Sequence, residues 1–413
     1  MQKLSEALLR CNSCGFCLAE CPVYKVTGIE WTAARGRLAL IRSALEGELK
    51  LSELAEPLFN CLGCNACVDH CPPQVMTDDI VLKARAELVR EQGQSWIQRL
   101  VFHTLLPNPS RLRRSAQLLG WLQASGLWAA ARGLGLIGLM GDAGKAGRIL
   151  PQVDRRQPMV RASPKLEHPK YRVAYFVGCA TTYLAPHVAR AAIRVLNRHG
   201  VELVEADFTC CGMPPLSYGD RETALMLAKK NTDLARSLEV DAIITTCATC
   251  GSLLKRYPDL LAEAPGYPAQ ARAMAGKVRD ISEFLADIGL NREMGTLKHR
   301  VTYHDPCHLG RFQKATRQPR QILQSIPGID FVEMPESNMC CGAAGSYSLG
   351  HYELSMKVLE RKMENVAKTD AELLVTCCPG CSLQLAHGAR ERGMKVRAVE
   401  LVELLDRAYR SAC

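Results

Sequence analysis

The spacing of hydrophobic and polar positions differs between the two halves of the chain. In the first half, apolar residues between Thr32 and Gly47 recur at helical spacing, which predicts a helix there. From Tyr171 onward, short apolar runs alternate with helical stretches such as Glu222–Leu238 and Glu353–Val366. Such alternation predicts α/β units built around a parallel sheet. The fold class we expect is therefore α+β and multidomain, with a helical first part and an α/β second part.

The second half contains an internal repeat, with an offset of 128–131 residues between the first three pairs of matching segments and 118 residues at the last. Each copy has the same order of features: an apolar run ending at a cysteine, a Cys-Cys-Gly, a second apolar run ending in C-x2-C, and a last short strand. The matching segments are 171–179 with 300–307, 210–212 with 340–342, 241–250 with 371–381, and 278–285 with 396–403. The pattern predicts cysteines at the carboxyl ends of parallel strands, where α/β folds place ligands.

The first half carries a cysteine motif that occurs twice. Both copies read C-x2-C-x2-C-x3-C-P, which is the spacing of a bacterial [4Fe–4S] ferredoxin site. The first three cysteines can wrap one cluster, whereas the fourth points away and ligates the other cluster. We therefore expect two cubane clusters, one held by Cys11, Cys14, Cys17 and Cys71, and one by Cys61, Cys64, Cys67 and Cys21. Paired zinc sites are the alternative, and two identical runs with matching prolines disfavour it.

The repeat supplies two further sets of five cysteines. They are Cys179, Cys210, Cys211, Cys247 and Cys250 in the first copy, and Cys307, Cys340, Cys341, Cys378 and Cys381 in the second. Five thiolates exceed the needs of one zinc ion or one cubane, and adjacent cysteines suit a larger, opened iron cluster. Single members could instead be buried structural thiols. Two of the 20 cysteines remain: Cys413, which we expect to be spare, and Cys377, which leaves the register of the second set open by one residue.

Polar residues near these cysteines have an open role. His304, Asp305 and His308 surround Cys307, where acid–base chemistry is conceivable. We favour the alternative that they orient the loop or hydrogen-bond to cluster sulfur. Arg35 and Arg37 lie between the two ferredoxin-type runs, and we expect them to be solvated.

Composition and charge narrow the class of protein. The chain has 413 residues, which predicts several domains. The N-terminus lacks the pattern of a signal peptide, so we expect a cytoplasmic protein whose cysteines bind metal instead of forming disulfides. The net charge of +10 is weak evidence for nucleic acid, because bound thiolates add negative charge and few aromatic residues accompany the basic ones. No glycine-rich nucleotide motif is visible, so we do not expect hydride transfer by this chain itself.

The predicted domain boundaries follow these patterns. Residues 1–90 form the ferredoxin-type domain, 91–170 a helical segment and linker, 171–290 the first cysteine-rich module and 299–413 the second. An apolar stretch from Ser115 to Gly141 follows Arg111, Arg113 and Arg114. We expect helices packed on the ferredoxin-type domain here. The alternative is a segment lying on the inner face of the membrane or docking a partner.

The order of motifs resembles a known family. The twin Cys-Cys-Gly modules resemble the cysteine-rich (CCG) domains of heterodisulfide reductase catalytic subunits, where such cysteines hold noncubane [4Fe–4S] clusters. The order of motifs along the whole chain resembles the iron–sulfur subunit of glycolate oxidase and related lactate dehydrogenases. Three short segments share this resemblance: the opening Cys11–Tyr24, Arg35-Gly-Arg37 and His304–His308. The insert between the two runs resembles helical ferredoxin domains of respiratory subunits.

The resemblance implies a function and partners. It implies an oxidoreductase subunit that takes electrons from an FAD-containing dehydrogenase subunit, which oxidises glycolate or lactate, and passes them to a quinone or another carrier. One or two noncubane clusters are implied, with zinc in one module as an alternative. Glycolate oxidase subunits often lack part of a cysteine set, whereas both sets are complete here. A subunit that reduces a disulfide at a noncubane cluster therefore stays open, and a zinc-dependent scaffold is the third hypothesis.

Overall fold

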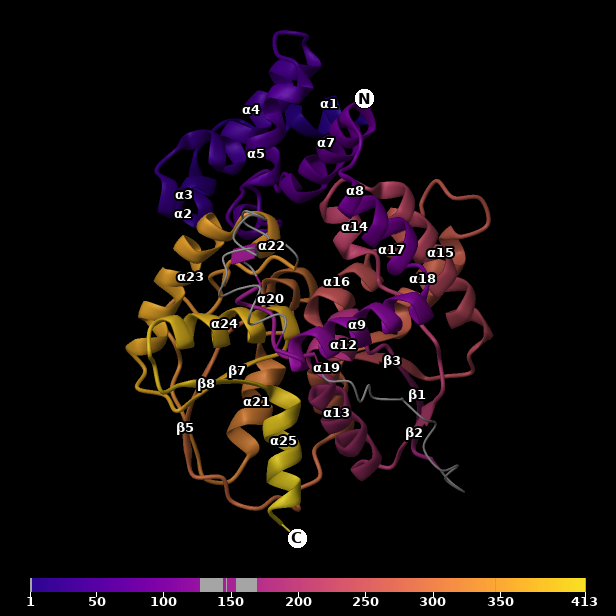
Figure 1. Ribbon diagram of the computed structural model, residues 1–413, viewed down its shortest axis with the longest axis vertical. Helices are drawn as coiled ribbons and strands as arrows, with labels where there is room; N and C mark the ends of the chain where they lie inside the picture. The colour runs from indigo at the N-terminus through magenta and orange to yellow at the C-terminus, as the bar shows by residue number, and fades with distance from the viewer. Residues whose placement is uncertain (1, 127–143, 146, 154–168, 346, 413) are drawn as a thin grey trace.

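The computed structural model describes residues 2–126, 144–145, 147–153, 169–345 and 347–412. Figure 1 shows a helical N-terminal region at the top and two α/β modules below it, side by side. We call residues 171–290 module 1 and residues 299–413 module 2. The N-terminus lies at the top of the figure, in the N-terminal region, and the C-terminus lies at the bottom, at the end of module 2.

Short helices build the N-terminal region. They are α1 (Gln2–Leu9), α2 (Phe16–Glu20), α3 (Pro22–Thr27), η1 (Glu30–Thr32), α4 (Ala34–Leu45), η2 (Leu51–Leu54), α5 (Ala55–Phe59), α6 (Ala66–Asp69) and α7 (Thr77–Gln92). The predicted helix after Thr32 is confirmed as α4, whose Leu38 and Ile41 are buried in a core with Leu58 and Leu88. Both cysteine loops turn into a helix at a left-handed residue, Gly15 before α2 and Asn65 before α6. The two loops therefore share one backbone geometry.

The segment that follows packs differently from the expectation. It contains α8 (Trp96–Arg99), the π-helical turn η3 (Leu100–Leu105) and α9 (Pro109–Ala124). Phe102 and Leu106 are buried in the core of the two modules, and the Phe102 ring lies 5.8 Å from that of Tyr218. The expected packing on the ferredoxin-type domain is therefore wrong. The rest of the apolar stretch, beyond Gly126, and most of the predicted linker lie outside the described residues.

Each module contains a four-stranded parallel sheet, as the alternating pattern predicted. Module 1 has the strand order β2 (Val201–Val204), β1 (Tyr171–Tyr175), β3 (Ala242–Thr245), β4 (Val278–Asp280). Module 2 repeats it as β6 (Ile329–Phe331), β5 (His299–Tyr303), β7 (Leu373–Thr376), β8 (Arg397–Glu400). The registers correspond, because Val173 pairs with Ala242 in module 1 and Val301 pairs with Leu373 in module 2. The repeat in the sequence is thus a repeat in structure.

The two modules face each other with approximate twofold symmetry. Helices of module 1 are α12 (Cys179–Leu184), α13 (Pro186–Arg198), α14 (Met213–Ser217), α15 (Arg221–Ser237), α16 (Ala248–Lys255), α17 (Tyr257–Leu260), α18 (Pro268–Lys277) and α19 (Ile281–Ile288). Those of module 2 are α20 (Cys307–Gln313), α21 (Arg317–Ser325), α22 (Tyr347–Gly350), α23 (Tyr352–Ala367), α24 (Pro379–Glu391) and α25 (Leu401–Arg410). Helix α13 packs on α25 as α21 packs on α19, and α16 packs on α20 as α12 packs on α24. One continuous hydrophobic core joins the modules.

Candidate metal centres

Four predicted ligands from the N-terminal region line one cavity. Cys61, Cys64 and Cys67 come from the loop before α6 and from α6 itself, and Cys21 lies between α2 and α3. The cavity has a volume of about 400 Å³ including the open space at its mouth. Burial raises the pKa values of the Cys21 and Cys67 thiols. The structure thus brings together the set that the fourth-cysteine rule assigned to the second cubane.

The other N-terminal set lies nearer the surface. Cys11 and Cys71 both pack against the helical core of the N-terminal region. Burial, and to a smaller extent the nearby Cys11, raise the pKa of the Cys17 thiol. Cys14 is exposed. This set therefore presents one of its cysteines to solvent.

Arginines between the two ferredoxin-type runs are not both solvated. Arg37 is 2% exposed, lines the cavity of Cys21, and donates a hydrogen bond to the Pro57 carbonyl at 2.7 Å. The expectation is wrong for this residue, because its place on α4 directs its guanidinium inward. Arg35 is partly exposed and donates to the Ser13 carbonyl at 3.1 Å, beside Cys14. It therefore supports the loop that carries the first set.

All five cysteines predicted for module 2 line one cavity of about 360 Å³, again including its mouth. They are Cys307, Cys340, Cys341, Cys378 and Cys381. Cys377 is not among the lining residues, and the Tyr303 hydroxyl donates a hydrogen bond to its sulfur at 3.5 Å. The structure thus places Cys378, and not Cys377, in the cavity with the other four cysteines.

The cysteines predicted for module 1 also lie close to one another. The sulfurs of Cys179 and Cys210 lie 3.9 Å apart. Hydrogen bonds from Cys210 and Cys250 lower the pKa of the Cys211 thiol to about 5. In module 2, hydrogen bonds from Cys340 and Cys381 likewise lower the pKa of Cys341. The second cysteine of each Cys-Cys pair is thus readily deprotonated, as a metal ligand must be.

Two contacts between the cysteine sets were not visible in the sequence. Cys64 of the N-terminal region and Cys340 of module 2 lie in the same buried cluster, and the neighbouring Cys340 raises the pKa of the Cys64 thiol. The Cys378 sulfur of module 2 lies near the Cys247 thiol of module 1 and 3.6 Å from the Thr249 hydroxyl, and the Ala248 amide donates to the Cys377 carbonyl at 3.3 Å. Only the folded chain brings these positions together, because they are far apart in the sequence. The cysteines therefore form one continuous series from the N-terminal region to module 1.

The polar residues around Cys307 divide into three environments. Asp305 accepts two hydrogen bonds from Arg320, at 2.8 and 2.7 Å, which holds the loop in place. His308 shares a 2.6 Å hydrogen bond with Ser252 of module 1, and burial lowers the pKa of this histidine to about 4. His304 is fully buried, and neither ring nitrogen has a hydrogen-bond partner among the described residues. The side chains of Asp305 and His308 are thus hydrogen-bonded to other protein groups, whereas the His304 ring has no such partner among the described residues.

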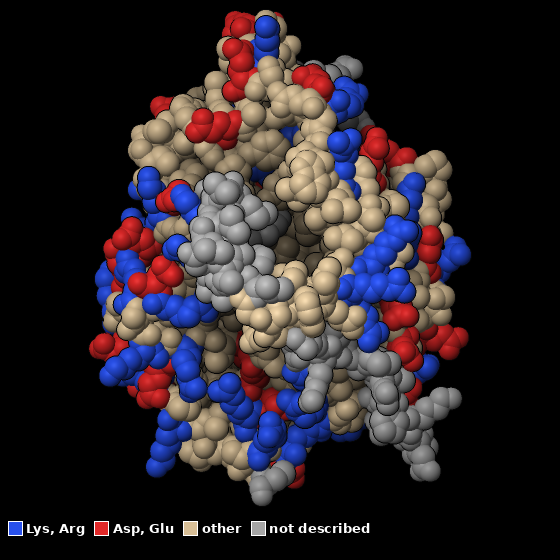
Figure 2. Space-filling model, viewed as in Figure 1, with Lys and Arg blue, Asp and Glu red and all other residues tan. Residues whose placement is uncertain are grey.

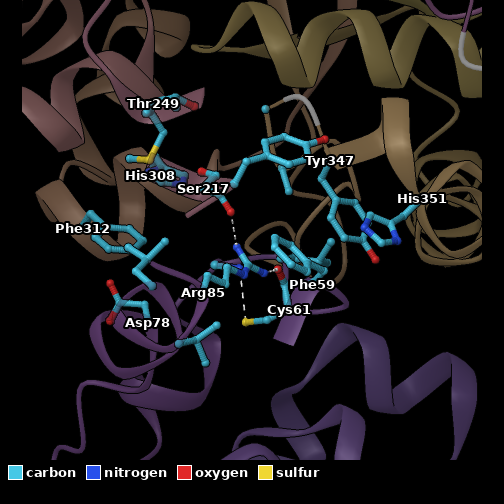
Figure 3. A pocket seen from close by; sticks show the side chains of 18 of the residues that line it. Phe59, Cys61, Asp78, Arg85, Ser217, Thr249, His308, Phe312, Tyr347 and His351 are labelled. Atoms are coloured by element: carbon cyan, nitrogen blue, oxygen red, sulfur yellow. Dashed lines mark hydrogen bonds between the residues drawn. The ribbon is translucent and has the colours of Figure 1, made fainter. Parts of the chain in front are cut away.

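A larger cavity lies where the N-terminal region meets both modules (Figure 3). Its volume is about 720 Å³ including open space. Much of its lining is apolar or aromatic, including Phe59, Phe312 and Tyr347. The Tyr347 side chain is 7% exposed, and its hydroxyl has no hydrogen-bond partner among the described residues. Cys61 lies on one wall and His308, which also lines the module 2 cavity, on another. The cavity thus adjoins two of the cysteine sets.

The chemistry of the lining residues fits iron–sulfur clusters. The 19 described cysteines are all free of disulfides. Cavities lined by four or five thiols, with arginines such as Arg37 and Arg311 beside them, suit clusters that carry net negative charge. Cys21, Cys61, Cys64 and Cys67 would hold one cluster, and the five cysteines of module 2 another. No helix among the described residues is long and apolar enough to cross a membrane.

Comparison with family models defines the class of protein. Residues 7–75 match a 4Fe-4S dicluster domain, and residues 173–255 and 301–386 each match a cysteine-rich domain, CCG. Residues 93–150 match the linker region of the glycolate oxidase iron-sulfur subunit. The chain is thus an iron–sulfur protein with a dicluster domain and two cysteine-rich domains.

Similar proteins define the family. The chain is 35% identical to a probable glycolate oxidase iron-sulfur subunit of Bacillus subtilis, over 96% of this chain and 93% of the relative. It belongs to the family of glycolate oxidase iron-sulfur subunits. It is also 38% identical to a fumarate reductase (CoM/CoB) subunit of Methanothermobacter marburgensis, over 59% of this chain and 47% of the relative. A hypothetical protein of Helicobacter pylori has a similar fold, with a TM-score of 0.56 at 11% identity, covering 91% of this chain and 66% of that chain.

Proposed function

We propose that this chain is the electron-transfer subunit of a 2-hydroxyacid dehydrogenase complex, which oxidises glycolate or lactate. The relative from Bacillus subtilis is named as a probable subunit of glycolate oxidase, and it matches this chain along nearly its whole length. Oxidation of the hydroxyacid takes place on a separate, FAD-containing subunit. Two cubane clusters in the N-terminal region and a noncubane cluster in each module supply the redox chemistry when bound.

The observation that carries this proposal is the continuous series of cysteines. Cys14 is exposed at one end, and the contact of Cys64 with Cys340 joins the N-terminal region to module 2. The contact of Cys247 with Cys378 then joins module 2 to module 1. We propose that the flavoprotein docks near Cys14, where exposed Leu9 and Phe16 flank the first set. Cysteines that only stabilised separate domains would have no need to meet across domain boundaries.

The cavity in Figure 3 is the proposed site of a quinone acceptor. Its aromatic walls suit a planar apolar ring, and the unpaired Tyr347 hydroxyl can donate a hydrogen bond to a quinone carbonyl. Reduction of the quinone takes two electrons, delivered from the cysteine-held clusters, and two protons from solvent, and gives the quinol. Figure 2 shows a hollow in the molecular face between the N-terminal region at the top and the modules below.

The linker segment is the proposed site of peripheral attachment to the inner face of the membrane. Trp96, Leu118 and Trp121 expose large apolar side chains there, and Arg113 and Arg114 are exposed on the same helix as Trp121. Basic and aromatic side chains together favour the interface of an anionic bilayer. Such attachment would bring the chain close to a lipid-soluble quinone.

A second candidate function is the reduction of a disulfide at the module 2 site. The observation that favours it is the complete set of five cysteines in both modules, together with the relative named as a fumarate reductase (CoM/CoB) subunit. Zinc in one module is the alternative to a second noncubane cluster.

The test is anaerobic purification of the complex and of the isolated chain. The complex is expected to contain FAD and to reduce a soluble quinone analogue when glycolate or lactate is added, whereas the isolated chain should not oxidise either acid. Full activity of the flavin-free chain would overturn the proposal. Thiol–disulfide activity of the isolated chain, without any response to hydroxyacids in the complex, would favour the second candidate.

A further inference from the structure

The two modules differ at the residue that follows β1 in module 1 and β5 in module 2, and in module 2 this residue lines the cysteine cavity. Phe176 and His304 each follow the last residue of an equivalent strand, β1 and β5. Their backbone amides donate equivalent hydrogen bonds, from Phe176 to the Ile244 carbonyl at 2.8 Å and from His304 to the Val375 carbonyl at 2.9 Å. Both side chains are fully buried. Module 2 therefore has an imidazole where module 1 has a phenyl ring.

The environment of the Phe176 ring is that of an ordinary core residue. It packs against Phe208, with ring centroids 5.1 Å apart. The His304 ring has no hydrogen-bond partner on either nitrogen among the described residues. A buried polar group without a hydrogen-bond partner destabilises the fold. A histidine retained at such a position needs a partner that the polypeptide does not provide.

The position of the imidazole indicates what that partner is. His304 lines the cavity of the five module 2 cysteines. One of its ring nitrogens and the sulfurs of Cys341 and Cys381 all lie within 4.8 Å of one another. A neutral imidazole offers one N–H donor and one free nitrogen lone pair. Whatever metal group Cys341 and Cys381 hold therefore lies beside a ring nitrogen.

We propose that the imidazole of His304 is a sixth protein group in direct contact with the iron–sulfur cluster of module 2, a contact that the module 1 cluster lacks. The inference rests on the proposed function in that module 2 holds a cluster. His304 acts as a positioning and tuning residue. Nitrogen ligation, or a hydrogen bond to cluster sulfur, raises the reduction potential of iron–sulfur clusters.

A second difference between the modules would also raise the reduction potential of the module 2 cluster. A Cβ atom on Gly342 would meet the Ser355 carbonyl, and one on Gly212 would meet the Ala224 carbonyl, so Ser355 and Ala224 are equivalent positions on α23 and α15. Seven residues further along each helix lie Lys362 and Asn231. Lys362 is fully buried, and its ammonium donates to the Glu336 and Ser337 carbonyls at 2.6 and 3.2 Å. Module 2 thus has a buried cation beside Cys340 and Cys341 where module 1 has an amide.

The test compares H304F with the wild-type chain, both purified anaerobically in the complex. Phenylalanine is the residue that module 1 tolerates at this place, and H304Q serves as a second variant if H304F lowers the yield. The matched control is H387N, because His387 is also fully buried in module 2 but is hydrogen-bonded to the Tyr352 hydroxyl at 3.1 Å. Iron content, pulsed electron paramagnetic resonance with ¹⁴N- or ¹⁵N-histidine, and redox titration are the readouts.

The expected result has two parts. Wild type and H387N should show a histidine nitrogen coupling to a cluster signal, which changes on ¹⁵N-histidine labelling and is absent in H304F and H304Q. H304F and H304Q should also lower the midpoint potential of the module 2 cluster, and the signals of the N-terminal clusters should be unchanged. A module 2 cluster that is present by iron analysis but shows no histidine coupling, and an unchanged potential in H304F, would overturn this inference alone. Absence of iron from module 2 would overturn the proposed function as well.

Discussion

The junction between the N-terminal region and module 1 depends on one buried guanidinium. Arg85 of α7 is 5% exposed and lies on the wall of the cavity in Figure 3. It donates to three carbonyl oxygens: Leu58 at 2.7 and 3.1 Å, Cys61 at 2.6 Å and Ser217 at 2.8 Å. Leu58 lies in α5, Cys61 lies in the loop that follows α5, and Ser217 belongs to module 1. Arg85 therefore ties a cysteine loop to a neighbouring domain.

The variant R85M keeps much of the side-chain volume and removes every donor. Each buried carbonyl left without a partner costs about 1–3 kcal/mol, and water from the adjoining cavity offsets part of the loss. We therefore expect the loop around Cys61 to lose about 3 kcal/mol of local stability. That corresponds to roughly a hundredfold faster hydrogen exchange of the local amides, because about 1.4 kcal/mol is a factor of ten.

The assay is native-state hydrogen exchange of residues 58–63 by mass spectrometry. The control is R90M, since Arg90 lies on the same helix with a side chain that is 76% exposed and pairs only with Glu87 among the described residues. R85K should resemble R85M more than wild type, because an ammonium lacks the planar fork that reaches three carbonyls. Equal exchange in R85M and R90M would refute the role given to Arg85.

The cysteine sets and the charged residues of the chain support three further predictions. C341A should remove the module 2 cluster, about four irons per chain, and spare the N-terminal signals; an unchanged iron content would contradict the assignment. K362M should lower the potential of the module 2 cluster by tens of millivolts in a redox titration, because it removes a buried positive charge beside Cys340 and Cys341. No shift would place Lys362 outside the influence of the cluster. The double variant R113S/R114S should bind anionic vesicles roughly 30-fold more weakly than wild type in co-sedimentation, at about 1 kcal/mol per arginine. The control R317S, which removes an exposed arginine on α21, should bind like wild type. Equal binding by R113S/R114S and wild type would exclude this membrane surface.

Much of the fold was predictable because its signals are local. The alternation of strands and helices is encoded in short apolar runs, and the parallel order follows from the repeat. The grouping of Cys21 with Cys61, Cys64 and Cys67 around one cavity could be predicted because the ferredoxin spacing constrains the loop. The helix α4 was predictable from periodicity alone.

The features that were not predictable depend on packing between distant segments. The contacts of Cys64 with Cys340 and of Cys247 with Cys378 arise from how domains dock, which no local pattern encodes. The burial of Arg37 depends on the Pro57 carbonyl, 20 residues away. The difference between the environments of His304 and Asp305 depends on Arg320, which is hydrogen-bonded to the aspartate and leaves the imidazole without a partner among the described residues. The linker helices pack on module 1 because of Phe102, a residue that no motif marks.

The central claim is that electrons enter at the exposed Cys14 end and reach the modules along the series of cysteines. The most direct measurement is freeze-quenched electron paramagnetic resonance of the anaerobic complex after addition of glycolate or lactate, for wild type and C14S. In wild type, the clusters of both the N-terminal region and the modules should become reduced. In C14S, the module clusters should be present by iron analysis but should stay oxidised. Reduction of the module clusters in C14S at the wild-type rate would contradict the account.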